Sequence, residues 1–453
     1  MIEQTIAAQR EYFKSGKTLD VKTRLQYLKA LKREIISREA DIAAALKADL
    51  GKSASEAYMT ETGMVLEDLS CHIKHLKKWA KPKRRKTPLA QFPAKSYVLP
   101  SPYGNTLVIS PWNYPFLLSM QPLVGAIAAG NTVLLKPSRA SANTSAVIKS
   151  MIENVFPEGL CACAYGTDAI NEEVLSHKFD YIFFTGGKEI GAKVYRAASE
   201  HLTPVTLELG GKSPVIVDPT AKIDLAARRI VFGKFLNVGQ TCVAPDYAIA
   251  HVSVADKLAA SIKKYIDRFY PDALNNADYG KIISERHYAR VKNLIAGNVY
   301  CGGAVDDGQR KIEPTVLYPA TEDCPAMQEE IFGPVLPILT YSTEKELLDI
   351  IAKHPTPLAF YLFTTKKKTE KRIIRSVSFG GGCVNDTIMH IASTAIPFGG
   401  VGTSGIGGYH GKKSFETFSH CKSIIKKSNA LDLPVRYSPY TKFKDKLVKF
   451  FMH

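Results

Sequence analysis

Short apolar runs alternate with helical stretches from about residue 107 to residue 208, and this pattern limits the folds open to the chain. The runs are rich in Val, Ile, Leu and Phe, as in strands that are buried on both faces. They are Leu107–Ile109, Thr132–Leu135, Asp180–Phe184 and Val205–Glu208. Strands that alternate with helices predict an α/β fold with a parallel sheet, whose ligands lie at the carboxyl ends of the strands.

The alternation restarts at Pro214–Val217, which predicts a second α/β domain running to about residue 390. Helical stretches are expected at about 18–48 and 56–79, before the first apolar run. A basic, proline-rich segment between them and that run is expected to be a linker or an extended arm. The glycine-rich stretch 398–408 is expected to be a tight loop without regular structure.

The balance of charges narrows the classes of partner. The 453 residues include 60 basic and 43 acidic ones, a net charge of +17 that favours anionic ligands. The basic residues are dispersed and no nucleic-acid-binding motif accompanies them, so nucleic acid is not an expected partner. The eight cysteines form no CxxC pair, and no apolar run approaches the roughly twenty residues of a membrane span. We therefore expect a cytoplasmic protein without a metal site.

One cysteine and one glutamate stand in suggestive surroundings. Cys242 follows Gly239-Gln240-Thr241, and Glu208 enters a glycine turn. A thiolate can add to an aldehyde carbon, and a carboxylate can later activate water, so the two groups suit oxidation through a thioester. An arbitrary cysteine is more often a small buried hydrophobe, so the pair depends on its context.

Polar and glycine-rich segments follow three of the predicted strands. After the first, Asn113 lies between two prolines, where its amide could stabilise an oxyanion or simply form a turn. After the second, Lys136-Pro137-Ser138-Arg139 lies where a Rossmann-type sheet holds the adenosine ribose. After the third, Thr185–Gly191 opens a helix that would suit a pyrophosphate, although it is not a GxGxxG motif.

The second domain carries Glu329-Glu330 followed by Phe332. The two carboxylates could act as acid and base, or they could lie on an exposed helix end. Glu330 could instead hold a ribose hydroxyl while Phe332 packs against a nicotinamide ring.

With these segments in view, the chain resembles the aldehyde dehydrogenase superfamily, and within it the class 3 branch. Seven strings keep the family's order and spacing from about residue 10 to 440: Ser110–Pro115, Lys136–Ser138, Phe184–Gly186, Leu207–Lys212, Gly239–Cys242, Glu330–Val335 and Pro397–Gly402. The resemblance implies a Rossmann-like cofactor-binding domain, a second α/β catalytic domain, and a small oligomerisation arm with a C-terminal tail. Their expected boundaries are 1–80 with 103–208, 209–390, and 81–102 with 421–453.

The resemblance also implies the roles of single residues. Cys242 would be the nucleophile, Glu208 the general base, and Asn113 an oxyanion donor together with the backbone N–H of Cys242. Lys136 and Glu330 would hold ribose hydroxyls of the cofactor. The other implied cofactor contacts are Ile109, Trp112, Ser138, Arg139, Gly186, Gly191, Leu209 and Phe332. The implied activity is NAD(P)-dependent oxidation of medium- or long-chain aliphatic or aromatic aldehydes, through a thiohemiacetal and a thioester.

The chain departs from the family pattern at Arg139, where the family often has Glu. A guanidinium can bind a 2′-phosphate that a carboxylate would repel, so we expect NADP to be used at least as well as NAD. The alternative is that Arg139 turns into solvent.

Two other functions stay open at this point. One is a CoA-acylating dehydrogenase, which Glu208 argues against because those relatives generally lack a base there. The other is a non-catalytic binding protein on the same fold. For the substrate, Tyr58, Tyr114 and Phe235 are expected to line an apolar tunnel.

Two expectations concern partners. The resemblance suggests a homodimer, with the arm near 95–105 and a strand at about 422–427 at the interface. A basic amphipathic helix is predicted in the C-terminal tail, with Phe443, Leu447, Phe450 and Phe451 on one face. It would dock on the protein's own body or contact a membrane surface.

Overall fold

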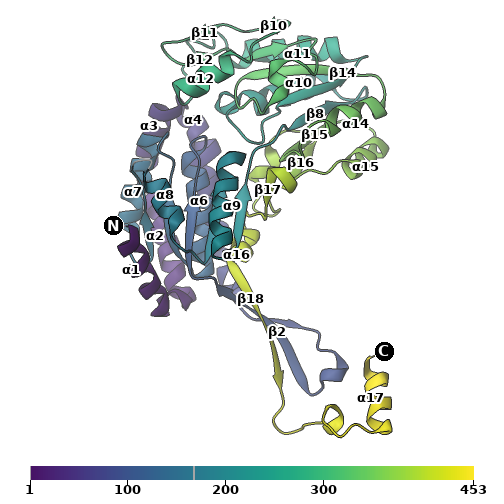
Figure 1. Cartoon of the computed structure of the whole chain (residues 1–453). Helices are drawn as coiled ribbons and strands as arrows, with labels where there is room; N and C mark the ends of the chain where they lie inside the picture. The colour runs from purple at the N-terminus through teal and green to yellow at the C-terminus, as the bar shows by residue number, and fades with distance from the viewer. Residues whose placement is uncertain (1, 167–168, 453) are drawn as a thin grey trace.

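The computed structural model describes residues 2–166 and 169–452. Figure 1 shows two α/β bodies, one built mainly from the N-terminal half of the chain and the other from the green central segments. A narrow arm leaves the first body and ends at the C-terminus, far from both (Figure 1).

The first body contains a six-stranded sheet in the order β17-β7-β6-β3-β4-β5. Every neighbouring pair is parallel except β17 with β7. The strands are β3 (Asn105–Ile109), β4 (Thr132–Lys136), β5 (Cys161–Cys163), β6 (Tyr181–Thr185), β7 (Val205–Glu208) and β17 (Gly405–Ile406). All residues of β3 and β6 are buried, as expected for strands covered on both faces. The predicted parallel sheet is confirmed.

Helices pack around this sheet (Figure 1): α1 (Ile2–Lys14), α2 (Val21–Ser37), α3 (Glu39–Leu50), α5 (Gly63–Trp79), α6 (Pro115–Ala129), α7 (Ala142–Val155), α8 (Ala169–Ser176), α9 (Lys188–Glu200) and α16 (Lys412–Thr417). The helical stretch expected at 18–48 consists of two helices, because Arg38 leaves the helical region with φ −105° and ψ 14°. The helix α1 was not expected. Short 3-10 segments connect elements: η1 (Lys17–Leu19), η3 (Leu89–Gln91), η4 (Leu236–Gly239), η5 (Met389–Ala392), η6 (Gly402–Ser404) and η7 (Pro434–Arg436).

The helical stretch expected at 56–79 also contains a change of helix type. The short α4 (Ala54–Ala57) continues into a π-helix, η2 (Tyr58–Thr62), before α5 begins. π-turns are rare and often lie at functional sites. This one turns Glu61 fully inward while leaving Tyr58 and Met59 about half exposed.

The second body contains a seven-stranded sheet in the order β10-β13-β14-β9-β8-β15-β16, in which only the edge strand β10 is antiparallel to its neighbour. Its strands are β8 (Pro214–Val217), β9 (Tyr247–His251), β10 (Val299–Cys301), β13 (Thr315–Leu317), β14 (Val335–Tyr341), β15 (Ala359–Phe363) and β16 (Gly381–Val384). A separate pair joins β11 (Val305–Asp306) to β12 (Lys311–Ile312). The helices are α10 (Ile223–Phe235), α11 (Ala255–Phe269), α12 (Glu285–Lys292), α13 (Pro325–Gln328), α14 (Glu344–Ala352) and α15 (Lys367–Ser376).

The glycine-rich stretch 398–408 is not free of regular structure, which corrects the expectation from the sequence. Its β17 pairs with β7, with Gly405 opposite Glu208. A Cβ at Gly405 would lie 2.4 Å from the backbone oxygen of Leu207, so glycine permits this close pairing. The chain therefore returns from the second body to the edge of the first sheet.

The arm is a three-stranded antiparallel sheet of β1 (Lys83–Arg85), β2 (Ala94–Pro102) and β18 (Ser419–Lys427). The strand expected at about 422–427 thus begins earlier, and part of the expected linker forms β1. Beyond β18 the predicted tail helix is present as α17 (Lys442–Met452), which contacts η3 and η7 of the arm. In the described part of the chain, no helix combines the length and apolar character that crossing a bilayer demands.

Candidate active site

The loop after α10 presents Cys242 from a strained turn. Asn237 and Val238 have left-handed φ values of 51° and 56°, which are unfavourable for a β-branched residue such as valine. Gly239 has a φ of 73°, and a Cβ there would lie 2.2 Å from the backbone oxygen of Gly333. Strain of this kind persists where the surrounding structure holds it, and it is common at functional sites.

Cys242 is half-buried in the wall between two cavities. The apolar cavity has a volume of about 300 Å³ and lies among η2, α5, α6, α10 and η5. The interdomain cleft has a volume of about 320 Å³ and lies between the two bodies. Leu118, Phe398 and Tyr409 also border both spaces. The thiol can therefore meet an apolar molecule from one side and a second molecule from the other.

Glu208 ends β7 and faces the interdomain cleft. It is buried, and among the described residues neither carboxyl oxygen has a hydrogen-bond partner of good geometry. Burial raises the pKa of Glu208 well above its usual value, and the nearby backbone N–H of Gly400 offsets this only in part. A carboxyl with a raised pKa and no fixed partner suits the transfer of a proton to or from water.

The thiol itself is not activated in the chain alone. Burial raises the pKa of Cys242 to about 12, and negative charge on Glu330 and Glu208 adds to the increase. Burial likewise raises the pKa of Glu330 to about 8. The resting thiol is therefore protonated at neutral pH. Its reactive form requires a base or a positive charge brought into the cleft.

Asn113 lies in the turn between β3 and α6 and borders the interdomain cleft. Its Nδ2 donates to the backbone oxygen of Gln240 at 3.0 Å, two residues before Cys242. A side-chain amide carries two N–H bonds, so the second can serve a group in the cleft. The hydroxyl of the next residue, Tyr114, bonds with that of Thr241 at 2.7 Å. The turn is thus tied directly to the loop that carries Cys242.

The interdomain cleft has features that fit a dinucleotide. The helix α9 begins there, its N-cap Gly187 provides no side-chain cap, and nothing lies within 4 Å of where a Cβ of Gly187 would be. The start of this helix is thus uncapped by its N-cap residue and borders the cleft, as a pyrophosphate site requires. At Gly210 a Cβ would lie 2.0 Å from Oε2 of Glu330, so glycine admits that carboxyl to the cleft. The Thr185 hydroxyl is buried without a partner among the described residues.

The cleft brings together most of the residues predicted from the sequence: Trp112, Asn113, Gly186, Glu208, Leu209, Cys242, Glu330 and Phe332. Five others do not line it: Ile109, Lys136, Ser138, Arg139 and Gly191. Ile109 and Lys136 are register partners at the carboxyl ends of β3 and β4, and Ser138 and Arg139 follow in the next turn. Gly191 lies within α9, where a Cβ would meet the Leu209 side chain at 2.6 Å. The roles of all these residues stay predictions.

Residues that the sequence patterns do not single out hold the segment that carries Glu330 and Phe332. Phe332 has a left-handed φ of 49°. Arg290 donates to the Glu329 carboxylate at 2.9 Å, to the Glu330 backbone oxygen at 3.2 Å and to that of Ile331 at 2.5 Å. Glu329 is thus engaged in an ion pair with Arg290, and its side chain is more than half exposed.

A second support reaches the same segment from the other side. Lys212 donates to Asp246 at 2.7 Å and to the Glu329 backbone oxygen at 3.0 Å. Asp246 in turn accepts the Ile331 N–H at 3.0 Å. No local sequence signal reveals this clamp, because its members lie far apart in the chain.

The apolar cavity is lined in part as expected. Tyr58 and Tyr114 border it, but Phe235 does not. Phe235 is buried and packs edge-on against Tyr270, at a centroid distance of 6.2 Å. Phe232, three residues earlier on α10, and Leu236, the residue that follows the helix, border the cavity instead.

Comparison with known proteins finds a family, relatives and a solved structure to which this chain is similar. Residues 1–424 match the model of the family described as "Aldehyde dehydrogenase family". The 4,4'-diaponeurosporen-aldehyde dehydrogenase of Staphylococcus aureus is 48% identical, over 100% of this chain and 99% of its own. The "Aldehyde dehydrogenase, dimeric NADP-preferring" of Rattus norvegicus is 44% identical, over 97% of this chain and 98% of its own. A solved structure, the substrate-bound state of Staphylococcus aureus AldH, superimposes with a TM-score of 0.98 at 47% identity, covering 100% of both chains.

Proposed function

The chain belongs to the aldehyde dehydrogenase family, and from this premise we propose that it oxidises apolar aldehydes to carboxylic acids through a thioester on Cys242. One observation carries the proposal. Cys242 lies between the apolar cavity and the interdomain cleft, and Glu208 and Asn113 face the same cleft.

Each step assigns a task to a residue of the chain. The thiol proton of Cys242 passes to solvent through the cleft, the sulfur bonds to the aldehyde carbon, and the carbonyl oxygen takes the electron pair. The free N–H of Asn113 and the backbone N–H of Cys242 stabilise that oxygen. Loss of hydride from the same carbon then leaves a thioester on the sulfur. Glu208 takes a proton from water, the water oxygen adds to the thioester carbon, and the C–S bond breaks to release the acid.

A nicotinamide dinucleotide bound in the cleft supplies the hydride acceptor. Within the chain, Lys136 and Glu330 would hold its ribose hydroxyls, the α9 N-terminus its pyrophosphate, and Phe332 its nicotinamide. The rat relative is NADP-preferring by name, which supports the use of NAD or NADP here.

For the cofactor we propose that NADP is used at least as well as NAD. Arg139 is exposed in the turn after β4, where the adenosine ribose would lie. We expect Arg139→Glu to lower kcat/KM with NADP roughly 10- to 100-fold, the scale of a lost hydrogen bond to a charged group, and to leave the value with NAD nearly unchanged. Steady-state kinetics with both cofactors measure this. Arg375 on α15 is also exposed, so Arg375→Glu is the matched control. A wild-type enzyme that strongly prefers NAD would contradict the proposal.

For the substrate we propose medium- or long-chain aliphatic or aromatic aldehydes. The cavity that reaches Cys242 is lined largely by apolar side chains, among them Met64, Leu117, Val243 and Ile391. The test is NAD(P)H production with a panel of aldehydes of increasing chain length, assayed without CoA. Rates that rise from short polar to long apolar aldehydes support the proposal. Activity that requires CoA would instead indicate that the acyl group is transferred to the thiol of CoA.

For assembly we propose a homodimer formed through the arm. The strand β18 pairs with β2 over nine residues, and within the described chain its other edge has no partner strand. A long open edge of this kind invites pairing with another chain. Sedimentation analysis of the purified protein tests this, and a monomer at micromolar concentration would contradict it. A cytoplasmic location likewise remains a proposal from the cysteine pattern.

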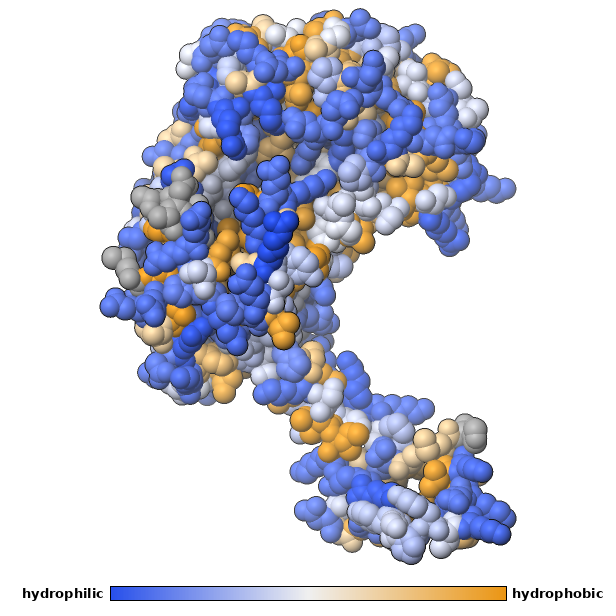
Figure 2. Space-filling view, viewed as in Figure 1, coloured by the Kyte–Doolittle hydropathy of each residue, from blue (hydrophilic) through white to orange (hydrophobic). Residues whose placement is uncertain are grey.

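For the tail we propose contact with an anionic membrane surface. In α17, Phe443 is 71% exposed and Phe450 and Met452 are each 76% exposed, next to Lys442, Lys446 and Lys449. Figure 2 shows hydrophobic surface on the arm beside strongly hydrophilic surface. A basic amphipathic helix of this composition binds anionic lipid headgroups. We expect the protein to sediment with vesicles rich in phosphatidylserine, to lose this when residues 441–453 are deleted, and to bind neutral vesicles weakly. Equal binding by the truncated chain would contradict the proposal.

A further inference from the structure

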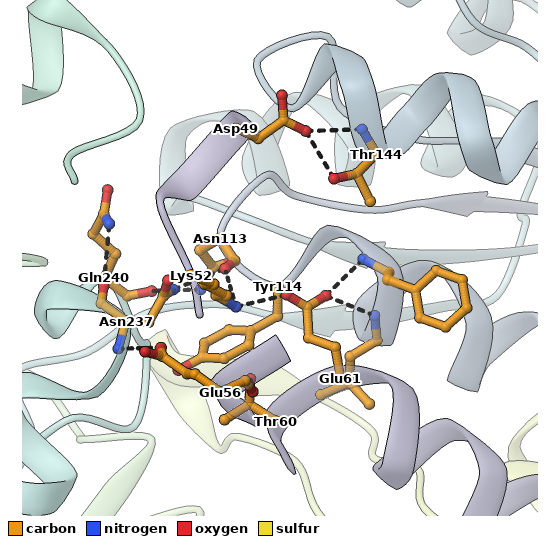
Figure 3. A network of polar contacts seen from close by, with 12 residues as sticks. Asp49, Lys52, Glu56, Thr60, Glu61, Asn113, Tyr114, Thr144, Asn237 and Gln240 are labelled. Atoms are coloured by element: carbon orange, nitrogen blue, oxygen red, sulfur yellow. Dashed lines mark hydrogen bonds and ion pairs between the residues drawn. The ribbon is translucent and has the colours of Figure 1, made fainter. Parts of the chain in front are cut away.

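A fully buried ion pair lies directly behind the Asn113 turn. Nζ of Lys52 is 2.6 Å from Oε1 of Glu61, and both side chains are 0% exposed. Lys52 precedes α4, and Glu61 lies in the π-helix η2 that also lines the apolar cavity. Figure 3 shows the pair in a network that continues to Asn113, Asn237 and Gln240.

Glu61 holds one side of the turn. Its Oε2 accepts the backbone N–H of Phe116 at 2.8 Å and that of Leu117 at 3.2 Å, in the first turn of α6. The N-cap residue of α6, Tyr114, provides no side-chain cap. Glu61, which is not part of α6, therefore caps this helix and supplies the negative charge that a helix N-terminus favours. In this way it fixes where α6 begins.

Lys52 holds the other side. Its Nζ makes a long contact of 3.5 Å with the backbone oxygen of Asn113 and lies 3.9 Å from the ring centre of Tyr114. The same oxygen of Asn113 accepts Nδ2 of Asn237 at 2.8 Å. Asn237 also donates to the Gln240 oxygen that receives the Asn113 amide. The turn is thus held by contacts with the ion pair and with the loop that carries Cys242.

Stability alone does not account for such a pair. Removing both charges from water is expensive, and apolar residues of the same size are often as stabilising at a buried position. A geometric role accounts for it better, because Lys52 contacts the carbonyl oxygen of Asn113 while Glu61 fixes the start of the helix that this turn enters. We propose that Lys52 and Glu61 are positioning residues that aim the Asn113 amide at the carbonyl oxygen of the substrate. The inference rests on the proposed function, in which Asn113 is an oxyanion donor.

The test compares Glu61→Gln, Lys52→Met and Asn113→Ala, singly and in pairs with Asn113→Ala. Glu61→Gln keeps the size of the side chain but removes the charge that Lys52 pairs with. We expect Glu61→Gln and Lys52→Met each to lower kcat roughly tenfold with little change in KM, because small misplacement of a catalytic group has effects of this order or larger. On the Asn113→Ala background the same changes should have almost no further effect, since they act through that amide.

Asp49→Asn is the matched control for a merely structural role. Asp49 is a buried carboxylate that accepts the N–H groups of Asn143 and Thr144 at the start of α7, away from Asn113. We expect it to lower Tm without changing kcat. Lys52→Arg, which keeps the charge, should recover most of the activity lost in Lys52→Met.

The possible failures are distinguishable. If Asn113→Ala has normal activity, the proposed oxyanion role fails, and the inference fails with it. If Asn113→Ala is slow but Glu61→Gln and Lys52→Met are normal, the proposed function stands and the positioning role is wrong. Effects that multiply in the double variants would also overturn the positioning role. If Glu61→Gln does not fold, the comparison of Lys52→Met alone and together with Asn113→Ala decides whether the positioning role holds.

Discussion

Cys242→Ala is expected to lower kcat/KM for aldehyde oxidation by roughly 10⁴- to 10⁶-fold, the scale on which enzymes lose activity with their covalent nucleophile. The reason is geometric: Cys242, the proposed nucleophile, borders both the apolar cavity and the interdomain cleft. Without it, no bond forms to hold the aldehyde carbon next to the hydride acceptor. The measurement is the rate of NAD(P)H formation at saturating cofactor.

Cys324→Ala serves as the control for this loss. Cys324 is also half-buried and free but lies in the second body, outside both cavities. We expect it to keep full activity, and we expect both variants to retain the Tm of the wild type within a few degrees. Substantial oxidation by Cys242→Ala would show that the chain does not work through this thiol.

Glu208→Gln is expected to lower the steady-state rate roughly 100- to 10,000-fold, the contribution typical of a general base. The first turnover should survive, because forming the thioester does not require water to be activated. Stopped-flow measurement should therefore show a burst of NAD(P)H of about one equivalent per active site, followed by a very slow phase. Loss of the burst together with the steady-state rate would contradict the assigned role.

The pH dependence of the wild type is expected to report the same group. The base form of Glu208 is the carboxylate, and burial raises the pKa of this group well above that of an exposed carboxyl. The steady-state rate should therefore rise with pH through a range above the usual carboxyl pKa, as the fraction of carboxylate increases. The slow phase of Glu208→Gln should lack this rise. A wild-type profile that is flat from pH 5 to 9 would argue against Glu208 as the limiting base.

Much of the fold was predictable because the signals are local. Val108, Leu135 and Phe183 belong to apolar runs in strands buried on both faces, and such runs separated by helical stretches specify a parallel sheet. The pairing of β17 with β7 was not predictable in this way. It joins residues almost two hundred positions apart, and it depends on glycine at 405 allowing the backbones to approach.

The residues of the site also fall into two groups, those with a signal in the local sequence and those without one. Cys242, Glu208 and Asn113 stand in strings that the family resemblance identifies, and the structure brings all three to one cleft. Lys52 and Glu61 carry no such signal, because their importance lies in contacts with Asn113 and α6 made more than fifty residues away in the chain. The pKa of Cys242 could not be read from the sequence either, since it depends on burial and on Glu330 from the second body.

The most direct test of the account is mass spectrometry of Glu208→Gln enzyme quenched after mixing with an aldehyde and cofactor. A variant that forms the thioester but cannot hydrolyse it should accumulate an acyl group. We predict an intact-protein mass increased by that acyl group, located after proteolysis on the peptide that contains Cys242 and absent when Cys242 is also replaced by Ala. Acid production by Glu208→Gln at the wild-type rate, or an acyl group on any other residue, would contradict the central claim.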